Sequence, residues 1–190
     1  GTGIIHQEMP KASVRMLGCQ LWVNLPAKDK MTEPAYGDIT QDKIVVTQEE
    51  KATVRILAGS YKGTKGVFEG KYVKVTYLDI DLAPDSTWTY RETPNDETLF
   101  IYLLDGTLAV DDLLQDFEEK SCAVLFRSTT PDAETNDAVV VRSGSQGARF
   151  VLLAAKPLRE PVAWGGPIVM NTREELEQAF NELDRGTFIK

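Results

Sequence analysis

VKVTYLDIDLAPDSTWTY (residues 73–90) contains two runs of β-branched and aromatic residues, separated by the turn-forming stretch APDS at residues 83–86. A proline at a turn position between two such runs is typical of antiparallel strands that follow one another along the chain. Within residues 73–82 apolar side chains occupy both alternating positions, so this strand either changes face at a bulge or is covered on both sides. The stretch predicts an all-β fold.

Similar runs recur between turn signals along the rest of the chain. They are residues 20–25, 43–47, 53–58, 99–104, 107–110, 122–126, 139–142 and 149–155. Many short strands at this spacing predict an antiparallel β-sandwich or barrel. The pair Asp105-Gly106 stands between two of the runs and predicts a hairpin turn at residues 104–107.

One helix, over residues 172–184, has clear signals at both ends. Thr172 and Glu175 have capping-box spacing at its start, and Gly186 supplies a stop after its end. Its apolar residues form one stripe, which predicts a packing surface made of Leu176, Ala179, Phe180 and Leu183.

Two other stretches lack a clear strand pattern. Residues 26–42 are polar and contain two prolines, which predicts an extended linker. Residues 111–120 are acidic and have a helix-like spacing of apolar residues. A loop inserted between two strands explains this second stretch equally well.

The chain of 190 residues carries a net charge of −8 without a cluster of Lys and Arg. This composition argues against direct nucleic-acid binding, which depends on neutralising phosphates. We see neither an apolar run long enough to cross a membrane nor a secretory signal, and we expect a cytoplasmic protein. Cys19 and Cys122 lie far apart among apolar neighbours, as buried free thiols in a reducing compartment do.

The single histidine, His6, stands two positions before Glu8. In an extended segment these two side chains share a face, with Gln7 opposed, and they can bind a metal ion together. Two donors leave most of the coordination sphere of a divalent ion to water, so the pair by itself is a weak signal. On the residues alone, a solvated segment that binds nothing is the more common explanation.

Three stretches together resemble the pirin family of the cupin superfamily. They are GIIHQEMP (residues 3–10), CQLWVNLPAKDKMTEP (residues 19–34) and EPVAWGGPIVMNTREELEQAF (residues 160–180). The resemblance implies a bicupin, with two antiparallel β-barrels and one metal ion, usually iron, held in the first barrel by three histidines and one glutamate. His6 and Glu8 match the last two of these four ligands.

The first two ligands of the family form a His-x-His pair, which has no counterpart in this sequence. We therefore expect the C-terminal two-thirds of a pirin-like protein. Residues 1–25 would be terminal strands of an incomplete first barrel, residues 26–50 a linker and first strand, residues 51–165 the second cupin barrel, and residues 166–190 a C-terminal segment with the helix. An incomplete barrel exposes a strand edge, so we also expect a homodimer or swapped assembly.

The resemblance also implies a function. An intact pirin of this kind would be an iron-dependent quercetin dioxygenase-like enzyme, with Glu8 binding the metal and deprotonating a flavonol hydroxyl. The alternative is an iron-dependent regulatory module that acts through protein partners, in the manner of a transcription cofactor. With two of the four ligands, this chain alone is expected to be an inactive fragment with an incomplete site for iron or another divalent transition metal.

Other polar and aromatic residues have simpler explanations. Residues 95–97 (NDE) stand where the paired histidines of a cupin would precede a strand of the second barrel. Three polar residues before a strand are usually a solvated loop, so we assign no metal to them. Trp22 and Trp164 are expected to pack in the core or between barrels, whereas Met9 is expected to line a pocket beside the ligand pair.

Overall fold

The computed structural model describes residues 1–92, 97–110, 114–119, 123–127 and 138–189. The chain forms two compact units: residues 38–157 make up one, and residues 1–37 together with residues 158–190 make up the other. In the described part of the chain, no helix is both long enough and apolar enough to span a membrane.

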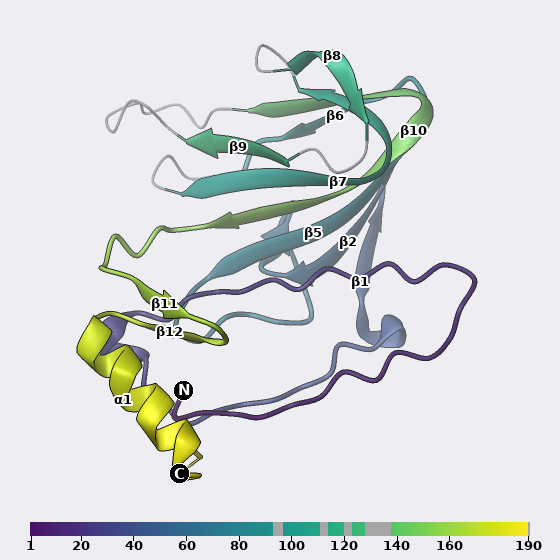
Figure 1. The fold of residues 1–190 in the computed structure, drawn as a ribbon. Coiled ribbons are helices and arrows are strands. Elements are labelled where there is room, and N and C mark those ends of the chain that lie inside the picture. The colour runs from purple at the N-terminus through teal and green to yellow at the C-terminus, as the bar shows by residue number, and fades with distance from the viewer. Residues whose placement is uncertain (93–96, 111–113, 120–122, 128–137, 190) are drawn as a thin grey trace. The chain divides into compact units, whose positions relative to one another are not determined.

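The larger unit consists of antiparallel strands (Figure 1). The strands are β1 (Val45–Gln48), β2 (Ala52–Ala58), β3 (Ser60–Tyr61), β4 (Thr64–Lys65), β5 (Val75–Leu82), β6 (Thr87–Tyr90), β7 (Thr98–Val110), β8 (Leu114–Glu119), β9 (Ala123–Arg127) and β10 (Val139–Ala155). A short 3-10 turn at Gln41–Lys43 precedes β1, and a second one at Ala27–Asp29 belongs to the smaller unit. Each described pair of strands is antiparallel, which confirms the predicted all-β class.

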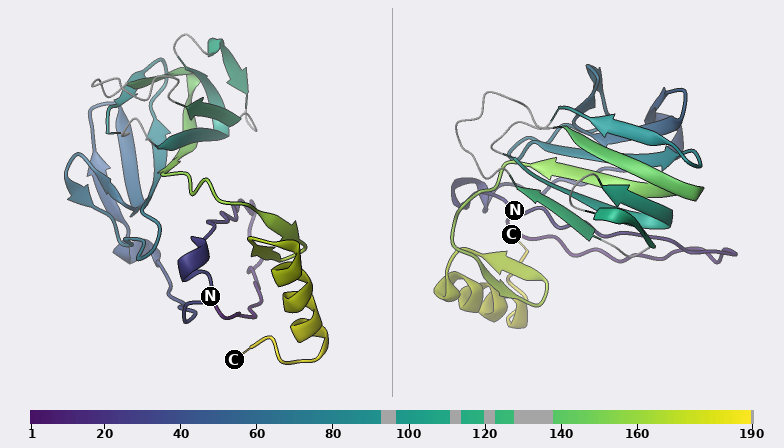
Figure 2. Two further views of the ribbon diagram at one scale, coloured as in Figure 1. Left: turned by 90° about the vertical axis from the view of Figure 1, so that its left-hand side faces the viewer. Right: turned by 90° about the horizontal axis from the view of Figure 1, so that it is seen from above.

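Two long strands, β7 and β10, build the barrel because each runs through both halves of one eight-stranded sheet. Residues 148–155 of β10 lie between β5 and the first half of β7, whereas residues 139–142 lie next to β6. One half of the sheet therefore has the strand order β1-β2-β5-β10-β7-β9, and the other half has the order β6-β10-β7-β8. Figure 2 shows the light green β10 running through the middle of this arrangement.

The prediction of a hairpin turn at residues 104–107 is wrong. Asp105 and Gly106 instead lie inside β7 and remain paired with β10 on both sides of the glycine. Gly106 has a φ angle of +78°, and the extra residues of β10 between positions 143 and 148 form a bulge opposite it. The glycine of an Asp-Gly pair readily adopts a positive φ angle, which both a bulge and a tight turn require. Because β10 pairs with β7 on both sides of Gly106, the chain forms a bulge here and not a turn.

Two further local predictions are wrong. Residues 114–119 form strand β8, paired with β7, where the sequence indicated a helix or a loop. Residues 20–25 do not form the predicted strand, and residues 1–44 contain none. A strand needs a neighbour to satisfy its backbone hydrogen bonds, and within the described ranges no strand pairs with this segment.

Strand β5 is covered on both faces, which decides between the two explanations of its apolar pattern. Leu78 and Ile80 belong to the main core inside the barrel, and neither is exposed to solvent. On the opposite face, Tyr77 packs against a second cluster made of Phe100, Tyr102, Leu104, Val151 and Leu153. The consecutive apolar residues of β5 therefore reflect burial on two sides.

Four charged side chains form a network across strands β2, β5 and β10. Arg149 donates hydrogen bonds to both carboxylate oxygens of Asp79, at 3.0 and 2.8 Å, and Arg55 donates to Asp81 at 2.6 Å. Arg55 Nη1 also lies 3.6 Å from Asp79 Oδ2. The hydrogen bonds to Asp79 raise the pKa of Arg149. Asp79 is the most enclosed member, with 12% of its side chain exposed against 43% for Asp81.

Three aromatic rings stack in the core of the barrel. The rings of Tyr61, Trp88 and Tyr90 have centroids 5.9 to 6.3 Å apart. Trp88 Nε1 donates to the Tyr61 hydroxyl at 3.0 Å, and that hydroxyl donates to Glu49 at 2.6 Å. Burial and the hydrogen bond to Glu49 raise the pKa of Tyr61, so the phenol stays protonated at neutral pH. The Trp88 indole N–H and the Tyr61 hydroxyl thus both have partners.

The smaller unit contains a hairpin and the predicted helix. Strands β11 (Ala163–Gly165) and β12 (Ile168–Met170) pair with one another, and α1 spans Arg173–Asp184. The Thr172 side chain accepts a hydrogen bond from the Glu175 backbone N–H, while the Glu175 side chain accepts one from the Thr172 backbone N–H. This capping box confirms the helix start that the sequence predicts.

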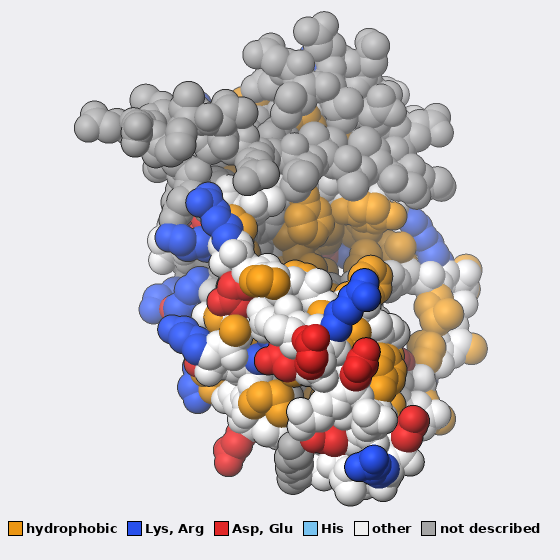
Figure 3. Space-filling model, turned by 60° about the vertical axis from the view of Figure 1, so that its left-hand side comes forward, with side chains coloured by type: hydrophobic (Ala, Val, Ile, Leu, Met, Phe, Trp, Pro, Cys, Tyr) orange, Lys and Arg blue, Asp and Glu red, His pale blue; other side chains and the backbone are white. Residues whose placement is uncertain are grey.

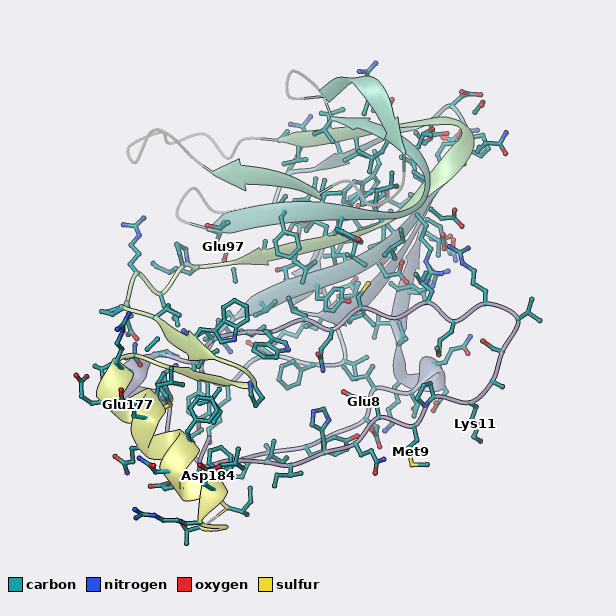
Figure 4. The ribbon with its side chains drawn as sticks, viewed as in Figure 1. Glu8, Met9, Lys11, Glu97, Glu177 and Asp184 are labelled. Carbon is teal, nitrogen blue, oxygen red and sulfur yellow. The ribbon has the colours of Figure 1, made fainter. Side chains whose placement is uncertain are left out.

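Acidic side chains are spread over the surface. Glu177 and Asp184 are exposed residues of α1 (Figure 4). In Figure 3 the red acidic side chains lie in small groups separated by apolar and uncharged ones. The net charge of −8 is therefore not concentrated in one block on this face.

Three residues of the smaller unit are more exposed than predicted. Cys19 is a free thiol, as expected, but its side chain is exposed, while Cys122 lies outside the described residues. Trp22 and Trp164 are 51% and 70% exposed, and their rings meet edge to face with centroids 6.2 Å apart. Packing in the core was therefore the wrong prediction for both tryptophans, whereas packing between barrels stays a prediction.

Candidate metal centre

His6 and Glu8 lie on the same side of the N-terminal segment. The distance between His6 Nδ1 and Glu8 Oε1 is 3.6 Å, and both side chains are more than half exposed. Figure 4 shows Glu8 and Met9 projecting to opposite sides of the segment, as successive residues of an extended chain do. Alternation thus brings the imidazole and the carboxylate together, although this segment forms no strand.

A third side chain, which sequence reasoning missed, reaches the same carboxylate. Gln20 Nε2 donates a hydrogen bond to Glu8 Oε1 at 3.2 Å, across a separation of twelve residues. Both contacts therefore converge on one carboxylate oxygen. The only sequence signal for Gln20 was its place in the pirin-like stretch of residues 19–34, which does not reveal a contact with residue 8.

An apolar cavity of about 830 Å³ lies beside His6. The N-terminal segment, residues 22–25, β12 and α1 contribute to its wall. Its apolar side chains include Ile4, Trp22, Met31 and Phe188. Met9 is 79% exposed and is not among the lining residues, because it projects away from the side that carries Glu8.

The donor atoms fit part of a metal site. An imidazole nitrogen and a carboxylate oxygen suit a divalent transition metal. Among the described residues, however, no three His, Cys, Asp or Glu side chains gather closely enough to hold such an ion. In the larger unit, Glu97 directly precedes β7 (Figure 4), while residues 95 and 96 lie outside the described ranges.

Known proteins share both the fold and the sequence. A crystal structure of quercetin 2,3-dioxygenase from Acinetobacter baumannii superposes with a TM-score of 0.75 at 29% identity, covering 88% of this chain and 55% of that one. Human pirin is 36% identical over 94% of this chain and 59% of its own length. A Thermoplasma acidophilum protein, named provisionally as a quercetin 2,3-dioxygenase, is 35% identical over 100% of this chain and 76% of its own length. The chain thus spans only part of each of them.

The antiparallel barrel with its two shared long strands, together with the likeness to the dioxygenase structure, defines a cupin. Residues 77–189 match the pirin C-terminal cupin domain. The chain belongs to the pirin family. The family and the cupin fold that the three sequence stretches predict are therefore confirmed.

Proposed function

We propose that the intact protein is an iron-dependent quercetin dioxygenase-like enzyme, with His6 and Glu8 as metal ligands and Glu8 also as the base. The observation that carries this proposal is the approach of His6 Nδ1 to Glu8 Oε1, at 3.6 Å, beside an apolar cavity. The names of the Acinetobacter and Thermoplasma proteins support quercetin as the substrate class. The free Cys19 thiol supports a reducing, cytoplasmic location.

The cavity beside His6 suits a flat aromatic substrate. Its volume of about 830 Å³ falls within the range of small-molecule sites. Trp22 and Phe188 contribute aromatic surface, and the histidine supplies a polar group at the wall. Lys30, Glu175 and Glu182 also line the cavity, so its wall offers polar groups for flavonol hydroxyls beside apolar area for the rings.

Glu8 has the chemistry that the first step of flavonol oxidation needs. Its carboxylate can accept the proton of a flavonol hydroxyl and hold it while the substrate is an anion. A divalent metal, when bound, supplies Lewis acidity that makes such a hydroxyl more acidic.

Oxygen consumption by the intact, iron-loaded protein with quercetin tests this function. Glu8→Gln should lower the rate by about 100-fold, because the amide cannot accept the substrate proton and is a poorer ligand. Glu33→Gln, a change of the same kind at an exposed glutamate of the same unit, should leave the rate unchanged. Equal rates for wild type and Glu8→Gln would refute the role of Glu8. Metal-dependent binding of a partner protein without any oxygen uptake would favour the regulatory module.

The 190 residues alone should not bind a transition metal tightly, and we propose that they are catalytically inactive. His6 and Glu8 leave roughly four positions of an octahedral ion to water. Calorimetric titration with zinc or ferrous ion should give a dissociation constant far above micromolar. Submicromolar binding of one metal per chain, lost in His6→Ala, would show that the donor set is complete and that the proposal of inactivity is unfounded.

A further inference from the structure

We propose that Gln20 is a positioning residue that orients the Glu8 carboxylate for metal binding. This inference rests on the proposed function, because it assigns a role relative to the same His6–Glu8 pair. Its basis is the hydrogen bond from Gln20 Nε2 to Glu8 Oε1 at 3.2 Å, on the oxygen that also lies 3.6 Å from His6 Nδ1. Two contacts on one oxygen restrict the rotation of the carboxylate.

The chemistry of an amide donor suits this task. Glu8 is 67% exposed, so little packing holds its side chain in one rotamer. Gln20 donates a hydrogen bond without adding a positive charge, and therefore orients the carboxylate without repelling a cation beside it. Hydrogen bonds to ligating side chains fix their orientation and change metal affinity in many metal sites.

The place of Gln20 in the chain links the carboxylate to the cavity. Gln20 is two residues before Trp22, which lines the cavity next to His6. Its hydrogen bond joins two segments twelve residues apart, one carrying the ligand pair and the other part of the cavity wall. Loss of this bond should therefore affect the ligand pair more than the fold, because Gln20 is exposed.

A metal-free measurement tests the contact itself. In the NMR spectrum of the wild-type chain, the side-chain amide protons of Gln20 should be shifted downfield relative to those of Gln7, a neighbouring exposed glutamine. The shift should collapse in Glu8→Ala. Gln20 amide signals that are identical in wild type and Glu8→Ala would overturn the proposal without any reference to a metal.

A zinc titration tests the consequence. His6 is the only histidine, so its ring proton signals report zinc binding at this one imidazole. Gln20→Met keeps the side-chain length and removes the donor, and should weaken zinc binding by about tenfold. Gln7→Met is the matched control and should leave the affinity unchanged. In a Glu8→Gln background, Gln20→Met should cause no further loss, because Gln20 acts through Glu8.

The outcomes separate this inference from the proposed function. If zinc shifts the His6 signals equally in wild type and Gln20→Met, Gln20 has no positioning role, while the assignment of His6 and Glu8 as metal ligands is unaffected. An equal loss from Gln20→Met in the wild-type and Glu8→Gln backgrounds would show a general structural effect and would also overturn the role. If zinc at millimolar concentration leaves the wild-type His6 signals unmoved, the metal-ligand assignment of the pair fails.

Discussion

Replacing Gly106 with alanine should lower the free energy of unfolding of the barrel by about 4 kcal/mol. Gly106 has a φ angle of +78°, which an alanine adopts only at a cost. In addition, a Cβ at this position would overlap with the carbonyl oxygen of Gly147, which belongs to the bulge of β10. Relief requires one of the two long strands to move, and both strands run through both halves of the sheet.

Gly63→Ala is the matched control for this prediction. Gly63 has nearly the same φ angle, +76°, but a Cβ there would meet no atom within 4 Å. Gly63→Ala should therefore lower the free energy of unfolding only by the cost of a positive φ angle in alanine, about 1–2 kcal/mol. Urea unfolding followed by near-ultraviolet circular dichroism, to which the stacked Tyr61, Trp88 and Tyr90 contribute, measures both variants. Equal losses in the two variants would contradict the crowding at Gly106.

Asp79→Ala should lower the free energy of unfolding by about 3 kcal/mol. The carboxylate accepts two hydrogen bonds from Arg149 and lies near Arg55, and only 12% of its side chain is exposed. Its removal leaves a guanidinium without its bidentate partner on a face that also carries the second apolar cluster. Removing one partner of an enclosed ion pair costs more than the pair itself contributes.

Asp81→Ala provides the comparison within the same network. Asp81 has 43% of its side chain exposed. Water can therefore replace much of the hydrogen-bonded ion pair that Asp81 forms with Arg55. We expect a loss of about 0–1 kcal/mol. The same urea experiment measures both variants. If Asp81→Ala proves as costly as Asp79→Ala, enclosure is not what determines the contribution of these carboxylates.

Features that depend on neighbouring residues could be predicted from the sequence. The helix start at Thr172 follows from a cap formed with Glu175, three residues away. Strands β5 and β6 follow from two apolar runs and the turn between them. The pirin family could be predicted because its motifs are continuous stretches, and the matches confirm it.

Features that depend on distant residues could not be predicted in this way. The Asp105-Gly106 pair favours a turn on local grounds, and only the presence of β10 along both sides of Gly106 makes it a bulge. At the candidate metal centre, the proximity of His6 and Glu8 follows from alternation, whereas the hydrogen bond from Gln20 depends on how two segments pack. The predicted burial of Trp22 failed for the same reason, since burial depends on what other segments cover.

The division of the chain into units fixes an order of assembly. Residues 1–37 pack with residues 158–190, and the entire barrel of residues 38–157 lies between them in sequence. During synthesis on the ribosome, residues 1–37 emerge before the barrel strands, whereas α1, which belongs to the same unit, is made after the last of them. The barrel can fold during this interval, since its strands pair only with one another. The cavity beside His6 is therefore completed last, and any ligand that requires it can be loaded only after the barrel strands have been synthesised.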